Sequence, residues 1–129
     1  MIAEIKRTKN IRLVGFVEEN DLYALYQLAS LYVYPSLYEG FGLPVLEAQA
    51  SGCAVVCSKV SSLPEVGGES VQYCDPYSED DIAQAVIKVL SDEVYRKDLI
   101  ARGYENIKRF NWDQSARELL GIMREVGSS

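Results

Sequence analysis

One short connection between two apolar segments combines two glycines, two separate prolines and two carboxylates. It spans residues 35–48 and is written PSLYEGFGLPVLEA, with seven residues between Glu39 and Glu47. Carboxylates accept hydrogen bonds from vicinal hydroxyls, such as those of sugars and ribose. Gly40 and Gly42 let the backbone approach a ligand closely because glycine has no Cβ. These residue types predict a site for an anionic, hydroxyl-rich molecule.

The elements on either side place this run where such a ligand can bind. Residues 31–34 predict a strand that stops at Pro35, and a helix is predicted from about Leu43, with Pro44 in its first turn. The start of a helix leaves backbone N–H groups unpaired at the positive end of the helix dipole, which favours phosphate. A plain turn before a helix is the simpler interpretation of the same residues. A general acid–base pair of carboxylates is a third.

The rest of the chain alternates strands and helices. This pattern predicts an α/β fold, a Rossmann-like parallel sheet with helices on both faces, followed by a C-terminal helical tail. We expect a single partial domain over 1–129, with the α/β part at 9–77 and the tail at 78–127. The predicted strands are 11–15, 31–34, 53–57 and 71–73, with a loop at 58–70. The predicted helices begin near Asn20, Leu43, Ser78, Asp92 and Asn111. The last helix has a capping-box pattern from Asn111 to Gln114.

The composition excludes some classes of partner. The 129 residues carry a net charge of −6, contain no histidine, and have no long basic run, so nucleic acid and anionic membrane surfaces are poor partners. No apolar run approaches the ~20 residues of a membrane span. Hydrophobic residues make up 48% and charged residues 25%, which is typical of a globular chain.

The three cysteines predict buried, reduced thiols. Cys53 and Cys57 lie in one predicted strand, where four residues span roughly 13 Å, which is too far for a disulfide. Cys74 leaves the number odd, and no histidine is present to complete a metal site. Reduced thiols are typical of a cytoplasmic protein, and we expect that location, with peripheral membrane association of a full enzyme still open.

Several motifs in order resemble family 4-like (group 1) retaining glycosyltransferases of the GT-B fold, over roughly residues 9 to 126. The most specific is the E-x7-E run from Glu39 to Glu47, which is similar to the donor-site motif of that family. Residues 10–17 look like the preceding strand and turn. Residues 52–56 resemble the family's G-x-P-V-V strand, with Ala54 where proline is common. Residues 63–66 and the turn at 75–76 also fit.

The resemblance implies a role for each matching residue and a reaction. The reaction is transfer of a sugar from a nucleotide diphosphate to an acceptor hydroxyl, with retained configuration and without a bound metal or other cofactor. The catalytic residue implied is Glu39, which contacts hydroxyls of the donor sugar. The remaining positions are binding residues: the backbone of Gly40, Phe41, Gly42 and Leu43 for the diphosphate, Glu47 for the ribose, and the turn at Phe16 and Val17 near the nucleobase.

Parts of such an enzyme are not matched by this sequence. The family's Arg/Lys pair on the diphosphate and its amino-terminal acceptor domain have no counterpart, and Lys6, Arg7 and Lys9 do not take the place of the pair. We therefore expect little or no activity from this chain alone. The implied strand order is 3-2-1-4-5-6, of which the chain supplies the third to sixth. We expect either self-association through exposed strand edges or a sheet rearranged so that 11–15 pairs with 31–34.

Other hypotheses stay open. The chain could be a non-catalytic binding or assembly module that keeps the glycosyltransferase fold. A sugar-nucleotide epimerase of similar architecture would not contain the E-x7-E run. The tyrosines of the first third and the lone Trp112 are interpreted as packing residues rather than as a sugar platform. These tyrosines are Tyr23, Tyr26, Tyr32, Tyr34 and Tyr38.

Overall fold

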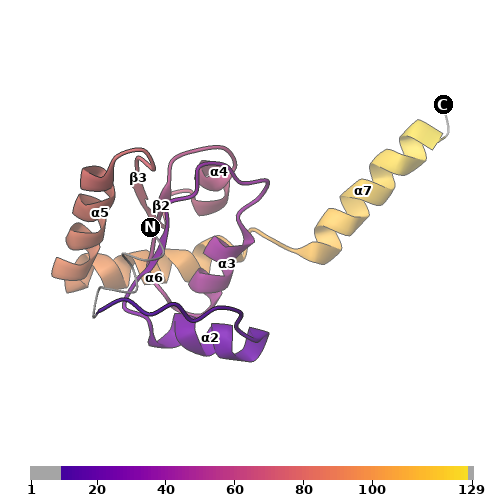
Figure 1. The fold of residues 1–129 in the computed structure, drawn as a ribbon. Coiled ribbons are helices and arrows are strands. Elements are labelled where there is room, and N and C mark those ends of the chain that lie inside the picture. Colours follow the sequence, from indigo (N-terminus) through magenta and orange to yellow (C-terminus); the bar gives the residue numbers. More distant parts are fainter. Residues whose placement is uncertain (1–9, 128–129) are drawn as a thin grey trace.

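The computed structural model describes residues 10–127. Helices and strands alternate up to residue 74, and only helices follow among the described residues (Figure 1). In chain order the elements are α2 Glu19–Leu28, β1 Tyr32–Tyr34, α3 Leu43–Ala50, β2 Val55–Ser58, α4 Leu63–Gly67, β3 Gln72–Cys74, α5 Glu79–Ser91, α6 Glu93–Ile107 and α7 Trp112–Gly127.

The three strands form a parallel sheet in the order β1-β2-β3. Val33 pairs with Val56, and Val56 pairs with Gln72, so β2 is the central strand. This order is the one expected for the fourth to sixth strands of the resembled fold. Because the strands are parallel, their carboxyl ends lie at one edge, and the loop from β1 to α3 begins there.

Helices cover both faces of the sheet, as the sequence predicts. β2 is buried along its whole length because successive side chains point to opposite faces. One core holds Tyr26 of α2, Val45 and Ala48 of α3, Val55 and Cys57 of β2, and Leu63 and Val66 of α4. The second core holds Ala54 and Val56 beside β3 residue Cys74, Ala85 and Val89 of α5, and Leu99 of α6.

A buried polar network joins α3 to α4 and α6. The Asn106 amide donates to Gln49 Oε1 at 2.9 Å and to the Val66 carbonyl at 2.8 Å. Gln49 in turn donates to Ser70 Oγ at 2.7 Å, and Arg109 donates to Asn106 Oδ1 at 2.7 Å. Buried polar groups that lose a partner cost about 1–3 kcal/mol, so this network fixes α3 firmly against its neighbours.

The predicted strand at 11–15 is wrong. These residues have no regular secondary structure, and Ile11, Leu13 and Val14 are 50%, 58% and 65% exposed. The expected rearrangement beside β1 is also wrong, because β1 pairs with β2 alone among the described residues. A short β-branched run forms a strand only when a neighbouring strand accepts its backbone hydrogen bonds, and the described residues supply none at that position.

Apart from shifts of one or two residues at the ends of the strands, three smaller differences separate the predicted and observed elements. The predicted loop at 58–70 contains α4, whose Pro64 sits in the first turn. α2 begins at Glu19 rather than after Asn20, and no side chain caps it. The Asn111 carbonyl oxygen Oδ1 accepts from Gln114 N at 3.3 Å, but the Gln114 side chain donates to Glu118 instead of completing the capping box.

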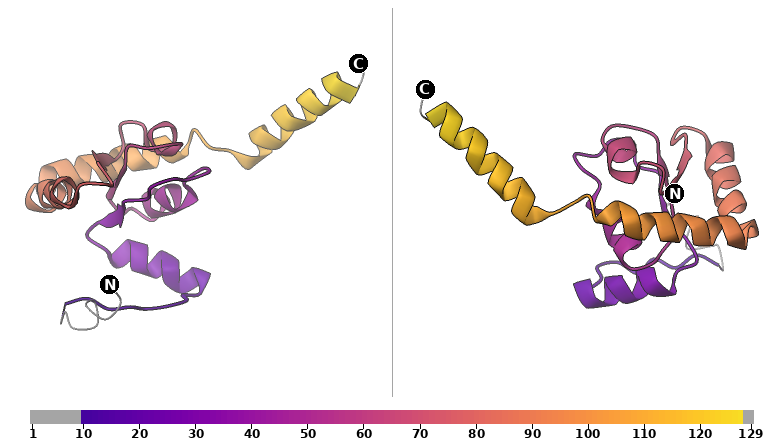
Figure 2. Two further views of the ribbon diagram at one scale, coloured as in Figure 1. Left: turned by 45° about the horizontal axis from the view of Figure 1, so that its top comes forward. Right: turned by 180° about the vertical axis from the view of Figure 1, so that it is seen from behind.

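α7 projects away from the sheet and its helices (Figures 1 and 2). None of its residues is buried, and its apolar residues line one side of the helix. Trp112 is 79% exposed, so its predicted packing role is not seen within residues 10–127. Within the described chain, no helix combines the length and the apolar character that crossing a bilayer requires.

The predicted buried thiols are confirmed. Cys53, Cys57 and Cys74 are all free and buried. Burial raises the pKa of Cys57 to about 12, so this thiol stays protonated and unreactive at neutral pH.

Candidate functional site

The loop between β1 and α3 brings the E-x7-E residues to the carboxyl edge of the sheet. Gly42 is the N-cap residue of α3, and no side chain caps this helix. Within residues 10–127, the backbone N–H groups of Gly40, Phe41, Gly42 and Leu43 donate to no protein acceptor. Pro44 follows and has no N–H to satisfy. Unpaired donors therefore gather at the positive end of the helix dipole.

The two glycines of the loop have different structural roles. Gly42 has φ 107°, and a Cβ there would lie 2.7 Å from Cδ2 of the fully buried Leu63. Only glycine suits both the left-handed backbone and the close packing on α4. Gly40 has no positive φ, and a Cβ there would meet nothing within 4 Å. Space beside Gly40 is therefore open to a ligand.

The Glu39 carboxylate is held by two hydroxyl donors. Tyr34 Oη and Ser36 Oγ both donate to Glu39 Oε1, the latter at 2.7 Å. The hydrogen bond from Tyr34, and then that from Ser36, lowers the pKa of Glu39, so the carboxylate is ionised at neutral pH. Burial, and then the hydrogen bond to Glu39, raises the pKa of Tyr34 to about 12. An ionised Glu39 is a hydrogen-bond acceptor and is poorly suited to act as a general acid.

Two serines before α4 bind the backbone of the loop. Ser61 Oγ accepts from Glu39 N and lies within hydrogen-bond distance of Glu39 O, both at 3.0 Å. Ser62 Oγ donates to Phe41 O at 2.7 Å and lies 3.1 Å from Glu39 O. Neither serine is among the site residues predicted from the sequence. Serine next to the start of a helix is a signal for a cap, and here the hydroxyls bind a different loop instead.

Glu47 lies about one turn into α3, beside the tyrosines of α2 and β1. Tyr32 packs edge-on against Tyr26 with ring centroids 5.1 Å apart and stacks on Tyr34 at 5.7 Å. Burial is the main cause that raises the pKa of Tyr26 and of Tyr32, and the Glu47 charge adds to both. The predicted packing role is confirmed for these three tyrosines, and Glu47 lies at the edge of their cluster. The same prediction is wrong for Tyr38, which is 79% exposed.

Phe16 and Val17, predicted to lie near a nucleobase, belong to the irregular segment before α2. Phe16 is 88% exposed and Val17 is half-buried. Within residues 10–127, neither residue makes a hydrogen bond or ring contact with the loop at 39–42. Their role stays a prediction.

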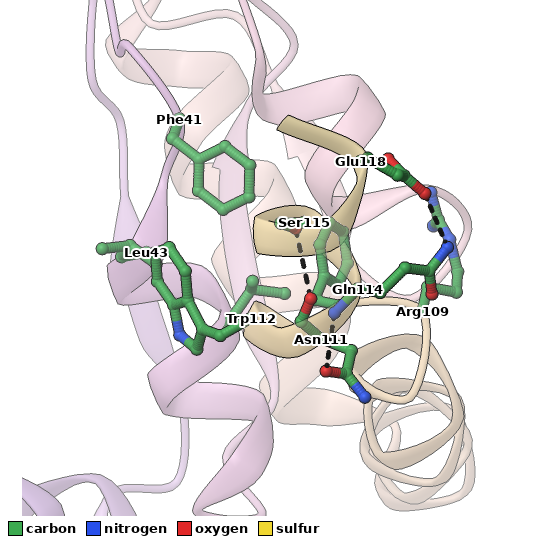
Figure 3. Close-up of a pocket in the computed structure, with 10 residues that line it drawn as sticks. Phe41, Leu43, Arg109, Asn111, Trp112, Gln114, Ser115 and Glu118 are labelled. Carbon is green, nitrogen blue, oxygen red and sulfur yellow. Dashed lines mark hydrogen bonds between the residues drawn. The ribbon is translucent and has the colours of Figure 1, made fainter. Parts of the chain in front are cut away.

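A pocket of about 400 Å³ adjoins the loop on the side of α7. Figure 3 shows Phe41 and Leu43 near Trp112 and the first turn of α7. Phe41 packs edge-on against Phe110, with ring centroids 5.9 Å apart, and the Arg109 guanidinium lies 5.2 Å from the Phe110 ring. This contact is not predicted from the sequence, because nothing in the local pattern around 109–110 relates these residues to one nearly 70 positions earlier in the chain.

Among residues 10–127, no three His, Cys, Asp or Glu side chains are grouped so that they could hold a metal ion. The expectation that the chemistry needs no metal or cofactor stays a prediction.

Comparison with known proteins identifies clear relatives. Residues 1–106 match the family described as glycosyl transferases group 1. The O-antigen chain mannosyltransferase B of Escherichia coli is 44% identical over 114 residues, which cover 88% of this chain and 30% of that protein. The chain thus spans less than a third of this relative's length.

The fold of the chain is similar to that of solved glycosyltransferase structures. A sucrose-phosphate synthase from Thermosynechococcus elongatus superposes with a TM-score of 0.84 at 28% identity, covering 98% of this chain and 33% of that one. The C-terminal domain of a glycosyl transferase group 1 family protein from Francisella tularensis superposes with a TM-score of 0.72 at 31% identity, covering 84% of this chain and 58% of that one.

The contrast between the two loop glycines gives a stability prediction. Gly42→Ala should destabilise the chain by at least about 2 kcal/mol, because the left-handed φ and the contact with Leu63 both penalise a Cβ. Gly40→Ala should change stability by no more than about 0.5 kcal/mol. Urea unfolding followed by circular dichroism measures both. Equal stabilities for the two variants would show that the loop does not have the described backbone.

The hydrogen bond from Tyr34 gives a prediction about charge. In Tyr34→Phe the pKa of Glu39 should rise toward its ordinary value, because the charged form loses its main donor. Carbon-detected NMR titration of the carboxylate measures this pKa, with Tyr38→Phe, a 79% exposed tyrosine, as control. A lowered carboxylate pKa stabilises the fold above the ordinary pKa, and this contribution is lost as the pH falls through the lowered value. Identical Glu39 titrations in all three proteins would contradict the assigned hydrogen bond.

Proposed function

The chain belongs to the group 1 glycosyl transferases, and from that premise we propose that it carries the nucleotide-sugar donor site of a retaining glycosyltransferase. The observation that carries the proposal is the set of free N–H groups from Gly40 to Leu43 at the start of α3. Such a helix start binds phosphate well, and the open space beside Gly40 gives the ligand access to the backbone. The diphosphate of the donor fits this place.

The two carboxylates complete the proposed site. Both hydroxyl donors to Glu39 reach Oε1, and among the described residues none reaches Oε2. Oε2 of the ionised carboxylate can therefore accept from hydroxyls of the donor sugar. Glu47 is proposed to accept from the ribose hydroxyls, because α3 carries it away from the phosphate end. Phe16 and Val17 are proposed to lie near the nucleobase.

The reaction proposed is transfer of the sugar to an acceptor hydroxyl with retained configuration. The basic pair and the acceptor side of such an enzyme would come from the parts of the relatives that this chain does not span. Mannosyltransferases among the relatives make mannosyl nucleotides the first donors to test. In this proposal no metal or cofactor takes part in the chemistry of the site.

A second candidate is a non-catalytic assembly module. The observation in its favour is α7, whose apolar side is uncovered within residues 10–127. The free edge of β1 adds a surface on which strands could pair. In this hypothesis the fold is retained and the chain contributes to a complex instead of binding a donor.

Donor binding is tested by titrating the chain with UDP, GDP and ADP while recording amide NMR spectra. We expect shifts at residues 39–47 and 16–17. Glu47→Gln should weaken binding about tenfold or more, because it removes a charge-assisted hydrogen bond to the ribose. Glu79→Gln is the matched control, since Glu79 lies in the first turn of α5 on the opposite side of the sheet. No response to any of the three nucleotides at millimolar concentration would reject donor binding and favour the assembly module.

Catalysis is tested separately from binding. We expect the 129-residue chain by itself to transfer no sugar from mannosyl or glucosyl nucleotides. The site described here contains neither a basic pair to bind the diphosphate nor a surface to bind the acceptor. Nucleotide release in the presence of sugar acceptors measures transfer. Measurable sugar transfer by the purified chain would contradict this expectation while leaving the donor site in place.

A further inference from the structure

We infer that Ser61 and Ser62 are positioning residues that aim the backbone N–H groups of Gly40 and Gly42 at the ligand. This inference rests on the proposed function, since it concerns how the diphosphate-binding backbone is oriented. It assigns a purpose to two residues that contact the loop at 39–42 but contribute no group to the ligand themselves.

The hydrogen bonds around the two serines can all be satisfied at once. Each serine hydroxyl has one proton to donate and two lone pairs to accept with. Ser61 Oγ accepts from Glu39 N and donates to Glu39 O. Ser62 then donates to Phe41 O, which is its shorter contact at 2.7 Å. Every donor and acceptor in this set therefore has a partner.

The orientation of the N–H groups follows from peptide geometry. The described chain contains no cis peptide bond, and in a trans peptide unit the C=O and N–H point in opposite directions. The carbonyl of Glu39 shares its peptide unit with the N–H of Gly40, and the carbonyl of Phe41 shares its unit with the N–H of Gly42. Because both carbonyls point toward the serines, both N–H groups point away from them.

The side toward which these N–H groups point is available to a ligand. Neither N–H donates to a protein acceptor within residues 10–127. A Cβ on Gly40 would meet nothing within 4 Å, so the backbone there faces open space. Gly42 is more buried than the exposed Gly40, so the Gly40 N–H is the outer donor of the two. Two free donors that both point away from the serines suit the oxygens of a diphosphate.

Two local features separate this role from ordinary helix capping. Ser62 is the N-cap residue of α4, yet its side chain makes no capping hydrogen bond to that helix. Its hydroxyl is used on the loop at 39–42 instead. Ser61 has φ 45°, a left-handed conformation that is unfavourable for a residue with a Cβ. A glycine would suit this backbone better, so the serine hydroxyl is retained at a local conformational cost.

The experiment compares Ser61→Gly, Ser62→Ala and Ser62→Thr with the wild-type chain. The probes are inorganic pyrophosphate and the nucleoside diphosphate that binds most tightly, followed by calorimetry and by the amide signals of Gly40 and Gly42. Ser78→Ala is the matched control, because it removes a serine hydroxyl that caps α5 by accepting from Asp81 N at 3.2 Å. This control accounts for any effect of losing a helix-associated serine elsewhere.

We expect Ser61→Gly and Ser62→Ala each to weaken binding of both probes about five- to tenfold, because each removes the hydrogen bond that orients one loop carbonyl. Ser61→Gly should do so while folding as stably as the wild type, because glycine accepts the left-handed backbone. Ser62→Thr should restore binding, and Ser78→Ala should leave it unchanged. The Gly40 and Gly42 signals should shift in the two weakened variants.

The outcomes separate the inference from the proposed function. No binding of either probe by the wild-type chain would overturn both. Wild-type binding that Ser61→Gly and Ser62→Ala leave unchanged would overturn the inference alone. A loss of binding in Ser62→Ala that Ser62→Thr fails to rescue, with Ser61→Gly unaffected, would likewise overturn it, since any role of Ser62 would then be structural.

Discussion

The packing of Gly42 against Leu63 is the constraint on which the site depends. Gly42 has a left-handed backbone at the start of α3 and lies where a Cβ would press on the buried Leu63 side chain of α4. This contact brings the loop after β1 onto the first residues of α4. The serines before α4 can then bind the loop carbonyls, and the free N–H groups face the open side. A larger residue at position 42 would separate these parts.

The electrostatics of the site are consistent with its backbone. Unpaired N–H groups and the helix dipole provide positive potential where a diphosphate is proposed to bind. The Glu39 carboxylate next to them is kept ionised by Tyr34 and Ser36, so it can accept hydrogen bonds from sugar hydroxyls. Glu47 is a further turn along α3, at the edge of the tyrosine cluster. Anion-binding and hydroxyl-binding groups are thus separated along one loop and one helix.

Much of this arrangement could be predicted from the sequence, because it depends on local patterns. The strand at 31–34, the helix from Leu43 and the fully buried strand β2 follow from periodicity, proline and glycine. Residues 11–15 have an equally good strand pattern, but strand formation depends on a neighbouring strand that the described residues do not provide. The contacts of Ser61 with Glu39 and of Phe110 with Phe41 join residues 22 and more positions apart. Such contacts depend on tertiary packing, and no local pattern indicates them.

The account is tested most directly by a crystal structure of the chain with GDP or UDP bound. It predicts that the diphosphate oxygens lie within hydrogen-bond distance of the N–H groups of Gly40 to Leu43 and that the ribose hydroxyls contact the Glu47 carboxylate. A nucleotide bound instead in the pocket beside Phe110 and Trp112, with the start of α3 left empty, would contradict it.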